Sequence, residues 1–233
     1  MKNLFLPGIA AFIMMCCITS CSVKNGDTTN PQQGYFLVAN ISPDASPLNI
    51  TINGSSFAGG FGYGNYTPYY STTAGSYMFA FYTNASTTTP VLSSTVDIAP
   101  STSYSYFIID SFSKVKSSFV QDNVVVPGGD SVYIRFFNFS PNAGTVALTD
   151  SASKTDLYTS RTFNDQSTTP VYSNFKRMLS GTYTLQLKLS DSTIASSKTY
   201  TLTAGRGYTF FAKGLLNSSS DSTAIGIGSI NNY

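Results

Sequence analysis

The sequence contains no histidine and no tryptophan, and all 11 of its acidic residues are aspartate. The missing histidine and glutamate are the commonest general bases and, with cysteine, the usual zinc ligands. Serine or cysteine nucleophiles activated by a histidine are therefore excluded. Aspartate and carbonyl oxygens could suit calcium, but the aspartates do not show EF-hand spacing. The sequence therefore predicts no metal site, no cofactor and no enzyme activity.

Charged residues are also scarce, at 10% of the chain. There are 13 lysines and arginines against 11 acids, which leaves a formal net charge of +2. Proteins that follow a nucleic-acid backbone need a concentrated excess of positive charge. We therefore expect no nucleic-acid partner.

The three cysteines all lie near the N-terminus, which reads MKNLFLPGIAAFIMMCCITSC. A basic residue at Lys2 precedes an apolar run from Leu4 to Ile18, and small residues follow, as in a secretory signal peptide. The run is shorter than the roughly 20 residues that cross a bilayer. Residues 1–20 are therefore predicted to be a signal peptide.

The stretch Ile18-Thr19-Ser20-Cys21 resembles the bacterial lipobox. The resemblance implies that Cys21 is lipidated and becomes the new N-terminus, so that the protein is anchored in a membrane; an ordinary cleaved secretory peptide is the alternative. Ser22 stands where an aspartate would indicate inner-membrane retention. The expected location is therefore the outer membrane, and we favour surface exposure over a periplasm-facing position.

After this processing, Cys21 would be the only cysteine left, with its sulfur acylated. The exported chain would then have no disulfide and would depend on burial of a hydrophobic core. Its 42% hydrophobic and 14% aromatic content supplies ample material for such a core.

Two kinds of segment follow the cysteine. Residues 21–34 are polar, contain a proline and glycines, and are predicted to be a flexible tether. From Tyr35 onward, short runs such as YFLVANI, SYMFAFY and TYTLQLKL are separated by turn residues. These runs are rich in β-branched and aromatic residues, and none sustains helical spacing of apolar positions. The sequence therefore predicts an all-β protein.

The chain contains nearly the same segment twice: ANISPDASPLNI at 39–50 and FNFSPNAGTVAL at 137–148, which are 98 residues apart. Two later matches have offsets of 106 and 104, so the register changes only through loop lengths. A period of about 100 residues suits a small β-sandwich. We therefore expect two sandwich domains, 35–123 and 131–233, joined by a linker at 124–130.

The repeated Ser-Pro-Asx stretch predicts a strand-ending turn in each copy. Pro43 and Pro141 preset φ at the first central position, and the following Asp44 and Asn142 are expected to bond nearby backbone amides. The exchange of aspartate for asparagine retains that geometry and removes the charge. A functional carboxylate at Asp44 is the alternative interpretation.

A second repeated motif places Tyr104 and Tyr208 six residues after an apolar residue, across a turn. This spacing resembles the tyrosine corner of Greek-key sandwiches, in which the phenol bonds the backbone a few residues upstream. We predict a structural role for both tyrosines.

With both motifs, the chain resembles the family called domain of unknown function 4397. The matching stretches are 40–45 (NISPDA), 51–54 (TING), 75–77 (GSY) and 205–209 (GRGYT). The resemblance implies an immunoglobulin-like β fold in exported or cell-surface proteins, often lipoproteins, and supplies no catalytic residue. The expected architecture is thus two tandem immunoglobulin-like, Greek-key β-sandwiches.

One aromatic segment, FAGGFGYGNYTPYY, places Tyr63, Tyr66, Tyr69 and Tyr70 among glycines and polar residues. Tyrosines in an adaptable loop form contact surfaces in protein and glycan binders. The other interpretation is that they cover the sandwich's own edge.

Taken together, these features predict a non-enzymatic envelope lipoprotein that acts as a binding, adhesion or scaffold module. Its partners would be the membrane, through the lipid, and a glycan or an envelope protein. One alternative is a glycan-binding module that uses Tyr63 to Tyr70. A divergent hydrolase is the second alternative, and it rests only on the aspartate content.

Overall fold

A computed structural model describes residues 32–86, 88–123 and 126–233. The predicted signal peptide, Cys21 and nearly all of the tether lie outside these residues. The described residues belong to one compact unit, Pro31–Tyr233. Within them, we find no helix with the length and apolar character needed to cross a membrane.

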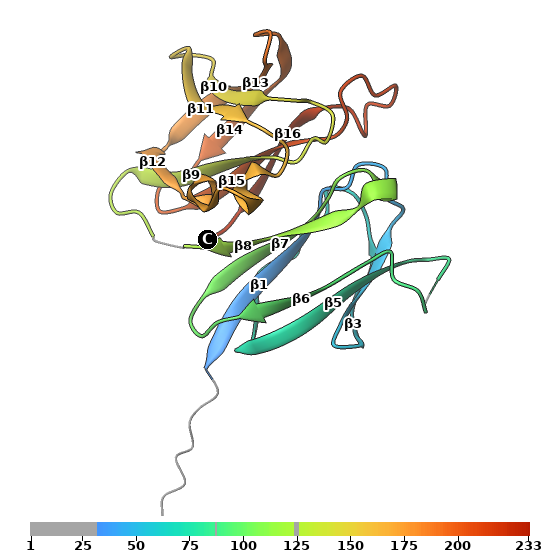
Figure 1. Ribbon diagram of the computed structural model, residues 1–233. Helices are drawn as coiled ribbons and strands as arrows, with labels where there is room; N and C mark the ends of the chain where they lie inside the picture. The colour runs from blue at the N-terminus through green and yellow to red at the C-terminus, as the bar shows by residue number, and fades with distance from the viewer. Residues whose placement is uncertain (1–31, 87, 124–125) are drawn as a thin grey trace, which may run out of the picture. The chain divides into compact units, whose positions relative to one another are not determined.

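The structure consists of β-strands and three short 3-10 helices in its described part (Figure 1). The first half contains β1 (Gln33–Asn40), β2 (Leu48–Ile52), β3 (Ser55–Phe61), β4 (Tyr70–Thr73), β5 (Gly75–Thr83), β6 (Leu92–Ile98), β7 (Ser103–Ile109) and β8 (Lys116–Asp122). The second half contains β9 (Ser131–Asn138), β10 (Val146–Asp150), β11 (Thr155–Arg161), β12 (Lys176–Leu179), β13 (Gly181–Leu189), β14 (Ile194–Leu202), β15 (Gly207–Lys213) and β16 (Gly226–Asn231). The 3-10 helices are η1 (Phe112–Lys114), η2 (Asp165–Ser167) and η3 (Pro170–Ser173). The all-β prediction is confirmed.

Each half consists of two four-stranded sheets with the same strand order. The first half has sheets β4-β1-β7-β8 and β3-β2-β5-β6, and the second has β12-β9-β15-β16 and β11-β10-β13-β14. The pairs β1–β7 and β9–β15 are parallel, and the other named pairs are antiparallel. The repeated order agrees with the predicted pair of immunoglobulin-like sandwiches.

Each half has its own hydrophobic core between its two sheets. In the first half, Phe79 and Phe81 of β5 point inward, where Phe79 stacks on Tyr106 with ring centroids 4.9 Å apart. The second half has an equivalent cluster around Phe136, Leu187 and Phe210. Burial of one such side chain contributes about 1.5–3 kcal/mol, so these clusters stabilise each sandwich without disulfides.

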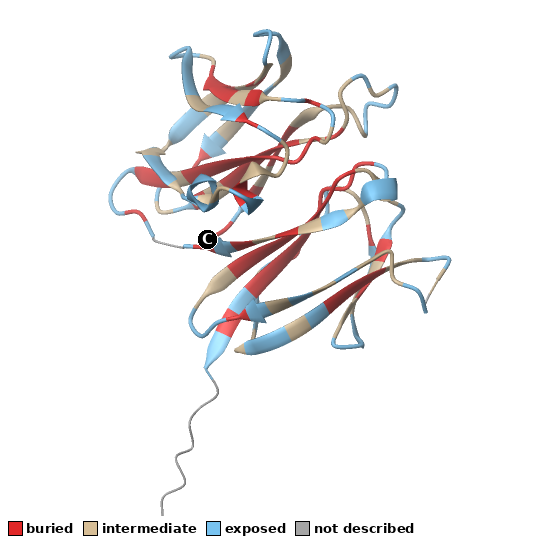
Figure 2. Ribbon diagram, viewed as in Figure 1, coloured by how far each residue is buried: buried red, intermediate tan, exposed pale blue. Residues whose placement is uncertain are grey.

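A third cluster joins the two halves. Leu37, Ile41 and Phe107 of the first half pack with residues of the second, among them Phe139 and Phe211. Sheet β4-β1-β7-β8 is therefore covered on both faces, and Figure 2 shows β1 and β7 as largely buried. This double burial explains why β1 reads as a continuous apolar run instead of alternating.

The repeated turn is organised by an asparagine in each copy. Asn40 donates from Nδ2 to the Phe61 carbonyl at 3.0 Å and accepts from the Ser42 N–H at 3.1 Å. Asn138 likewise donates to the Arg161 carbonyl at 3.2 Å and accepts from the Ser140 N–H at 3.0 Å. Both asparagines are buried, and each joins the turn to the end of a strand, β3 in the first half and β11 in the second.

Pro43 and Pro141 each begin the turn that follows this asparagine. Asp44 Oδ1 accepts a hydrogen bond from the Phe112 N–H at 2.7 Å, and Asn142 Oδ1 accepts one from the Leu216 N–H at 2.8 Å. These partners lie in the loops after β7 and β15, not in the turn itself. The side chains therefore join two loops at one end of each sandwich.

The predicted corner tyrosines differ in their surroundings. The Tyr208 hydroxyl accepts a hydrogen bond from the Thr203 N–H at 3.0 Å, five residues upstream. Tyr104 is buried and stacks on Phe119 with ring centroids 4.7 Å apart.

A second pair of tyrosines contacts the backbone in matching ways. The Tyr77 hydroxyl donates to the Thr73 carbonyl at 2.6 Å, and that of Tyr183 donates to the Leu179 carbonyl at 3.0 Å. These bonds give a structural reason for the repeated Gly-x-Tyr motif.

Candidate functional site

The four loop tyrosines do not gather on one surface. The Tyr69 hydroxyl donates to Asp122 Oδ2 at 2.6 Å and accepts from Asn232 Nδ2 at 3.0 Å. The next residue, Tyr70, pairs with Phe36 and lies against it on the other side of the sheet. Since successive side chains of a strand point to opposite faces, these neighbours are separated.

The other two loop tyrosines also lie apart. Lys213 Nζ of the second half lies 4.8 Å above the Tyr63 ring, and burial raises the pKa of Tyr63 to about 12. Tyr66, at 49% exposure, forms an isolated bridge with Ala39. Tyr63 and Tyr69 therefore contact the second half, while Tyr66 and Tyr70 are left exposed.

A buried polar network links the halves where Tyr69 lies. Arg135 of β9 forms an ion pair with Asp122 at the end of β8, and neither side chain is exposed. Asp122 Oδ2 also accepts from Ser105 Oγ at 2.7 Å. On the other side, Arg135 Nε donates to Thr209 Oγ1 at 2.8 Å, and that hydroxyl donates to Asn232 Oδ1 at 2.6 Å.

This network joins the halves and does not form a ligand site. Burial and the neighbouring Asp122 carboxylate raise the pKa of Tyr69. Shifted pKa values often mark functional sites, but buried ion-pair networks also produce them. A ligand could not reach Asp122 or Arg135, because both side chains are completely covered.

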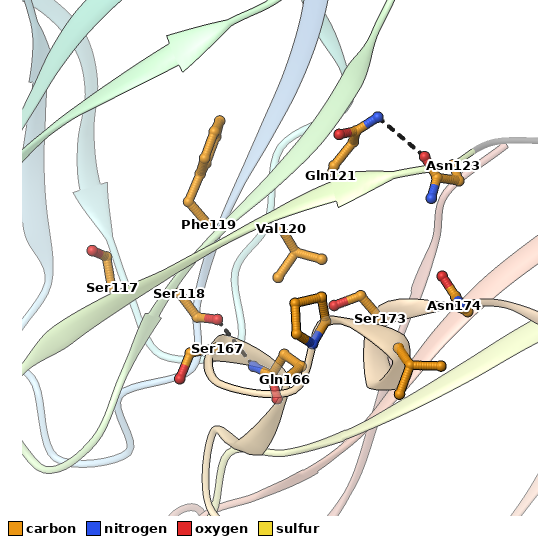
Figure 3. A pocket seen from close by; sticks show the side chains of 12 residues that line it. Ser117, Ser118, Phe119, Val120, Gln121, Asn123, Gln166, Ser167, Ser173 and Asn174 are labelled. Carbon is orange, nitrogen blue, oxygen red and sulfur yellow. Dashed lines mark hydrogen bonds between the residues drawn. The ribbon is translucent and has the colours of Figure 1, made fainter.

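A groove of about 670 Å³ runs along β8, which is an edge strand (Figure 3). One wall is the strand itself, and the other is formed by η2, η3 and Asn174. The lining residues are Ser117, Ser118, Phe119, Val120, Gln121, Asn123, Gln166, Ser167, Pro170, Val171, Ser173 and Asn174. We call this cavity the β8 groove.

The β8 groove is lined only by uncharged side chains, most of which carry a hydroxyl or an amide. Gln166 Nε2 donates across it to Ser118 Oγ at 3.0 Å, as Figure 3 shows. A smaller cavity of about 300 Å³ shares Asn123 and Asn174 and adds Tyr133 and Phe175. The shared residues make it a continuation of the groove toward two aromatic rings.

The outer wall of the groove lies where the two halves differ. In the first half, β3 and β4 are joined by residues 62–69, whereas β11 and β12 are joined by residues 162–175. The longer connection contains η2 and η3. In the sequence, this longer connection is visible only as the rise in the offset between the copies from 98 to 106. This rise is the sequence signal that could have indicated the extra segment, and with it the outer wall of the groove.

Other candidate chemistry is sparse. Within residues 32–86, 88–123 and 126–233, no group of three or more acidic, cysteine or histidine side chains could hold a metal ion. Of the aspartates nearest the groove, Asp165 pairs with Arg161 at 2.6 Å and Asp122 with Arg135. Neither carboxylate lines the groove.

Comparison with known proteins gives a family match and several distant structural neighbours. No curated protein matches the chain. One solved structure, on α-glucan binding by a streptococcal virulence factor, is 11% identical with a TM-score of 0.26 and covers 78% of this chain and 92% of that chain. Another, on α-glucan recognition by family 41 carbohydrate-binding modules from streptococcal virulence factors, is also 11% identical with a TM-score of 0.26, and covers 84% and 96%.

Likeness at that level carries no argument about ligand, so the family match is the informative result. The family model described as "Domain of unknown function (DUF4397)" matches residues 34–149. This stretch contains β1 to β8 of the first half and continues through β9 into β10. The resemblance predicted from the sequence is confirmed there: the chain carries a domain of the DUF4397 family.

Proposed function

We propose that the protein is a non-enzymatic binding module of the bacterial envelope, anchored at Cys21 and acting in adhesion or as a scaffold. The β8 groove is its ligand surface. The observation that carries this proposal is the groove itself, which is lined wholly by uncharged, hydrogen-bonding and apolar groups. Such a lining suits recognition of a neutral ligand.

The residue types of the chain support a role without catalysis. A hydrolase that used aspartates alone would need two carboxylates facing one bond. The β8 groove has no carboxylate among its lining residues, and the chain has no histidine or glutamate to serve instead. The groove can therefore hold a ligand through hydrogen bonds but offers no general base.

The lipid anchor is the second part of the proposal and rests on the lipobox resemblance. We expect labelled palmitate to be incorporated into the full chain and to be lost in Cys21→Ser. We further expect the wild type to fractionate with the outer membrane and to be cleaved by protease added to intact cells. Label that persists in Cys21→Ser would overturn the anchor at this residue.

The binding role is tested on the full chain in detergent micelles, titrated onto envelope fragments of its own bacterium. Val171 lines the groove and is 63% exposed, and Leu179 lies outside it and is 67% exposed. We expect saturable binding that weakens about tenfold in Val171→Asp and less than about twofold in Leu179→Asp. Binding that does not saturate, or that the two variants change equally, would overturn the role of the groove.

A glycan ligand is the second candidate function. The smaller cavity combines two amides, Asn123 and Asn174, with the rings of Tyr133 and Phe175. Amides bond sugar hydroxyls, and aromatic side chains offer apolar contact area beside polar groups. This candidate predicts that a panel of neutral oligosaccharides contains a ligand whose binding is lost in Asn174→Ala. It uses a different surface from the Tyr63 to Tyr70 loop.

A further inference from the structure

We propose that the β8 groove accepts an extended peptide segment, which pairs with β8 as an added strand of the sheet β4-β1-β7-β8. The inference rests on the proposed function, because it takes the groove as the ligand surface. It adds the class of ligand and the way in which that ligand is held.

The first argument is which residues line the groove. Five consecutive residues of β8, from Ser117 to Gln121, border it. Successive side chains of a strand point to opposite faces of a sheet, so a cavity above one face would meet only every second residue. A cavity that meets all five runs along the open edge of the strand. Backbone groups point in that direction.

The second argument is that this edge has no strand partner in the described part of the chain. β8 pairs with β7 on one side, and it is the last strand of its sheet. The facing segment bonds within itself, as in Ser167 N–H to the Asn164 carbonyl and Tyr172 N–H to the Thr169 carbonyl. An unpaired edge is a template for another strand, and peptide-binding domains use it in this way.

The third argument concerns the extent of the open edge. Gln166 donates to Ser118 and closes the groove at that end. From Phe119 to Asn123 the lining continues without such a link among the described residues. At about 3.3 Å per residue, this length accommodates a peptide of roughly five residues.

The chemistry of the two walls indicates the occupant. Pro170 and the exposed Val171 provide apolar contact on one wall, Phe119 and Val120 provide it on the other, and the remaining lining residues are serines and amides. None of the described lining residues carries a charge that could pair with a charged ligand. The occupant is therefore a neutral, extended segment of a partner protein, with small apolar side chains directed at Val171.

A peptide fits the main groove better than a sugar does. The aromatic residue in its lining, Phe119, already stacks on Tyr104 with ring centroids 4.7 Å apart. One face of this ring is therefore already covered, which leaves less aromatic surface for a sugar. The backbone edge of β8, by contrast, offers donors and acceptors at the regular spacing of a strand.

The test uses the full chain in detergent micelles and a phage library of random eight-residue peptides. Selected peptides are synthesised in two backbone-methylated forms, one with methyl groups on the odd-numbered nitrogens and the other on the even-numbered nitrogens. An added strand bonds through only one of these sets. We expect one form to lose at least about tenfold in affinity, since it loses several hydrogen bonds, and the other to bind like the parent peptide.

Two further measurements locate the peptide. Val171→Asp should weaken its binding about tenfold, and the matched control Leu179→Asp should change it less than about twofold. Hydrogen exchange of backbone amides in Phe119–Gln121 should slow by at least about tenfold in the complex. The exchange readout requires contact with the β8 edge, the Val171 readout requires contact with the facing wall, and neither depends on a change in folding.

Each contrary outcome has a definite meaning. Peptides that tolerate both methylation patterns, or that bind Val171→Asp normally, would overturn strand pairing. A neutral oligosaccharide that binds and is lost in Val171→Asp, with no peptide selected, would overturn the peptide inference and leave the binding role intact. Self-association of the chain that Val171→Asp abolishes would identify a second copy as the occupant and overturn the partner peptide. Failure of peptides, oligosaccharides and envelope fragments alike would overturn the binding role itself.

Discussion

Arg135 in the second half and Asp122 in the first form an ion pair from which solvent is completely excluded. The positions around it correspond in the two halves: Ser105 binds Asp122, and Thr209 binds Asn232. Arg135 pairs across the sheet with Thr209 just as Leu37 pairs with Ser105. Two differences between the copies, arginine in place of leucine and aspartate in place of asparagine, thus introduce the two charges at corresponding positions of the two faces.

The ion pair predicts a large penalty for removing one partner. Asp122→Asn or Arg135→Leu leaves the other group buried and incompletely compensated, and we expect each to lower the free energy of unfolding by about 3–5 kcal/mol. The double variant places leucine at 135 and asparagine at 122, as the other half does at the corresponding Leu37 and Asn232. It should therefore be more stable than either single variant, as measured by urea unfolding. Single variants that cost less than about 1 kcal/mol would contradict this account.

The hydrogen bonds of Tyr69 to the buried polar network should make the free energy of unfolding depend on pH in the alkaline range. Tyr69→Phe removes one hydrogen bond to Asp122 and one from Asn232, and it should cost about 1–3 kcal/mol near neutral pH.

The pKa of Tyr69 is raised above its ordinary value of 10.0. The stabilisation is therefore present below about pH 10 and is lost as the pH rises further, because the unfolded phenol ionises first. Urea unfolding at about pH 8 and about pH 11 should show a smaller alkaline loss in Tyr69→Phe than in the wild type. Equal losses of unfolding free energy in the wild type and in Tyr69→Phe would mean that ionisation of other tyrosines causes the alkaline destabilisation.

The turn residues predict that Asp44 acts through its oxygen and not through its charge. Asp44→Asn retains an acceptor for the Phe112 N–H, as Asn142 does for Leu216, so stability should change by less than about 0.5 kcal/mol. Asp44→Ala removes the acceptor and should cost about 0.5–1.5 kcal/mol in thermal or urea unfolding. A large loss of stability in Asp44→Asn would instead show that the negative charge itself stabilises the turn.

The third hydrophobic cluster, which joins the two halves, predicts that one half alone does not remain a folded monomer. Residues 32–123 expressed separately would expose Leu37, Ile41 and Phe107 and would leave Asp122 without Arg135. An exposed apolar patch of this kind promotes association. We expect light scattering after gel filtration to show oligomers or aggregates. A stable, folded monomer would show that the two cores between the sheets are sufficient.

Much of the fold could be predicted because its causes are local. The strands from Tyr35 onward follow from β-branched and aromatic runs, and their boundaries follow from glycine and proline turns. The duplication is visible in the sequence because repeated turns require the same residue types: Asn40 and Asn138 make equivalent bonds in the two copies. The absence of histidine and glutamate limits the chemistry available to the chain on the grounds of sequence alone.

The groove and the junction between the halves depend instead on contacts between residues far apart in the chain. Gln166 meets Ser118 across 48 positions, and Tyr69 meets Asn232 across 163. The sequence from Tyr63 to Tyr70 shows that four tyrosines are present. It does not show that Tyr69 contacts the second sandwich, whereas Tyr70 packs on the sandwich to which it belongs. Alternation within a strand is a local property, whereas the surface that covers each face is set by packing of the whole chain.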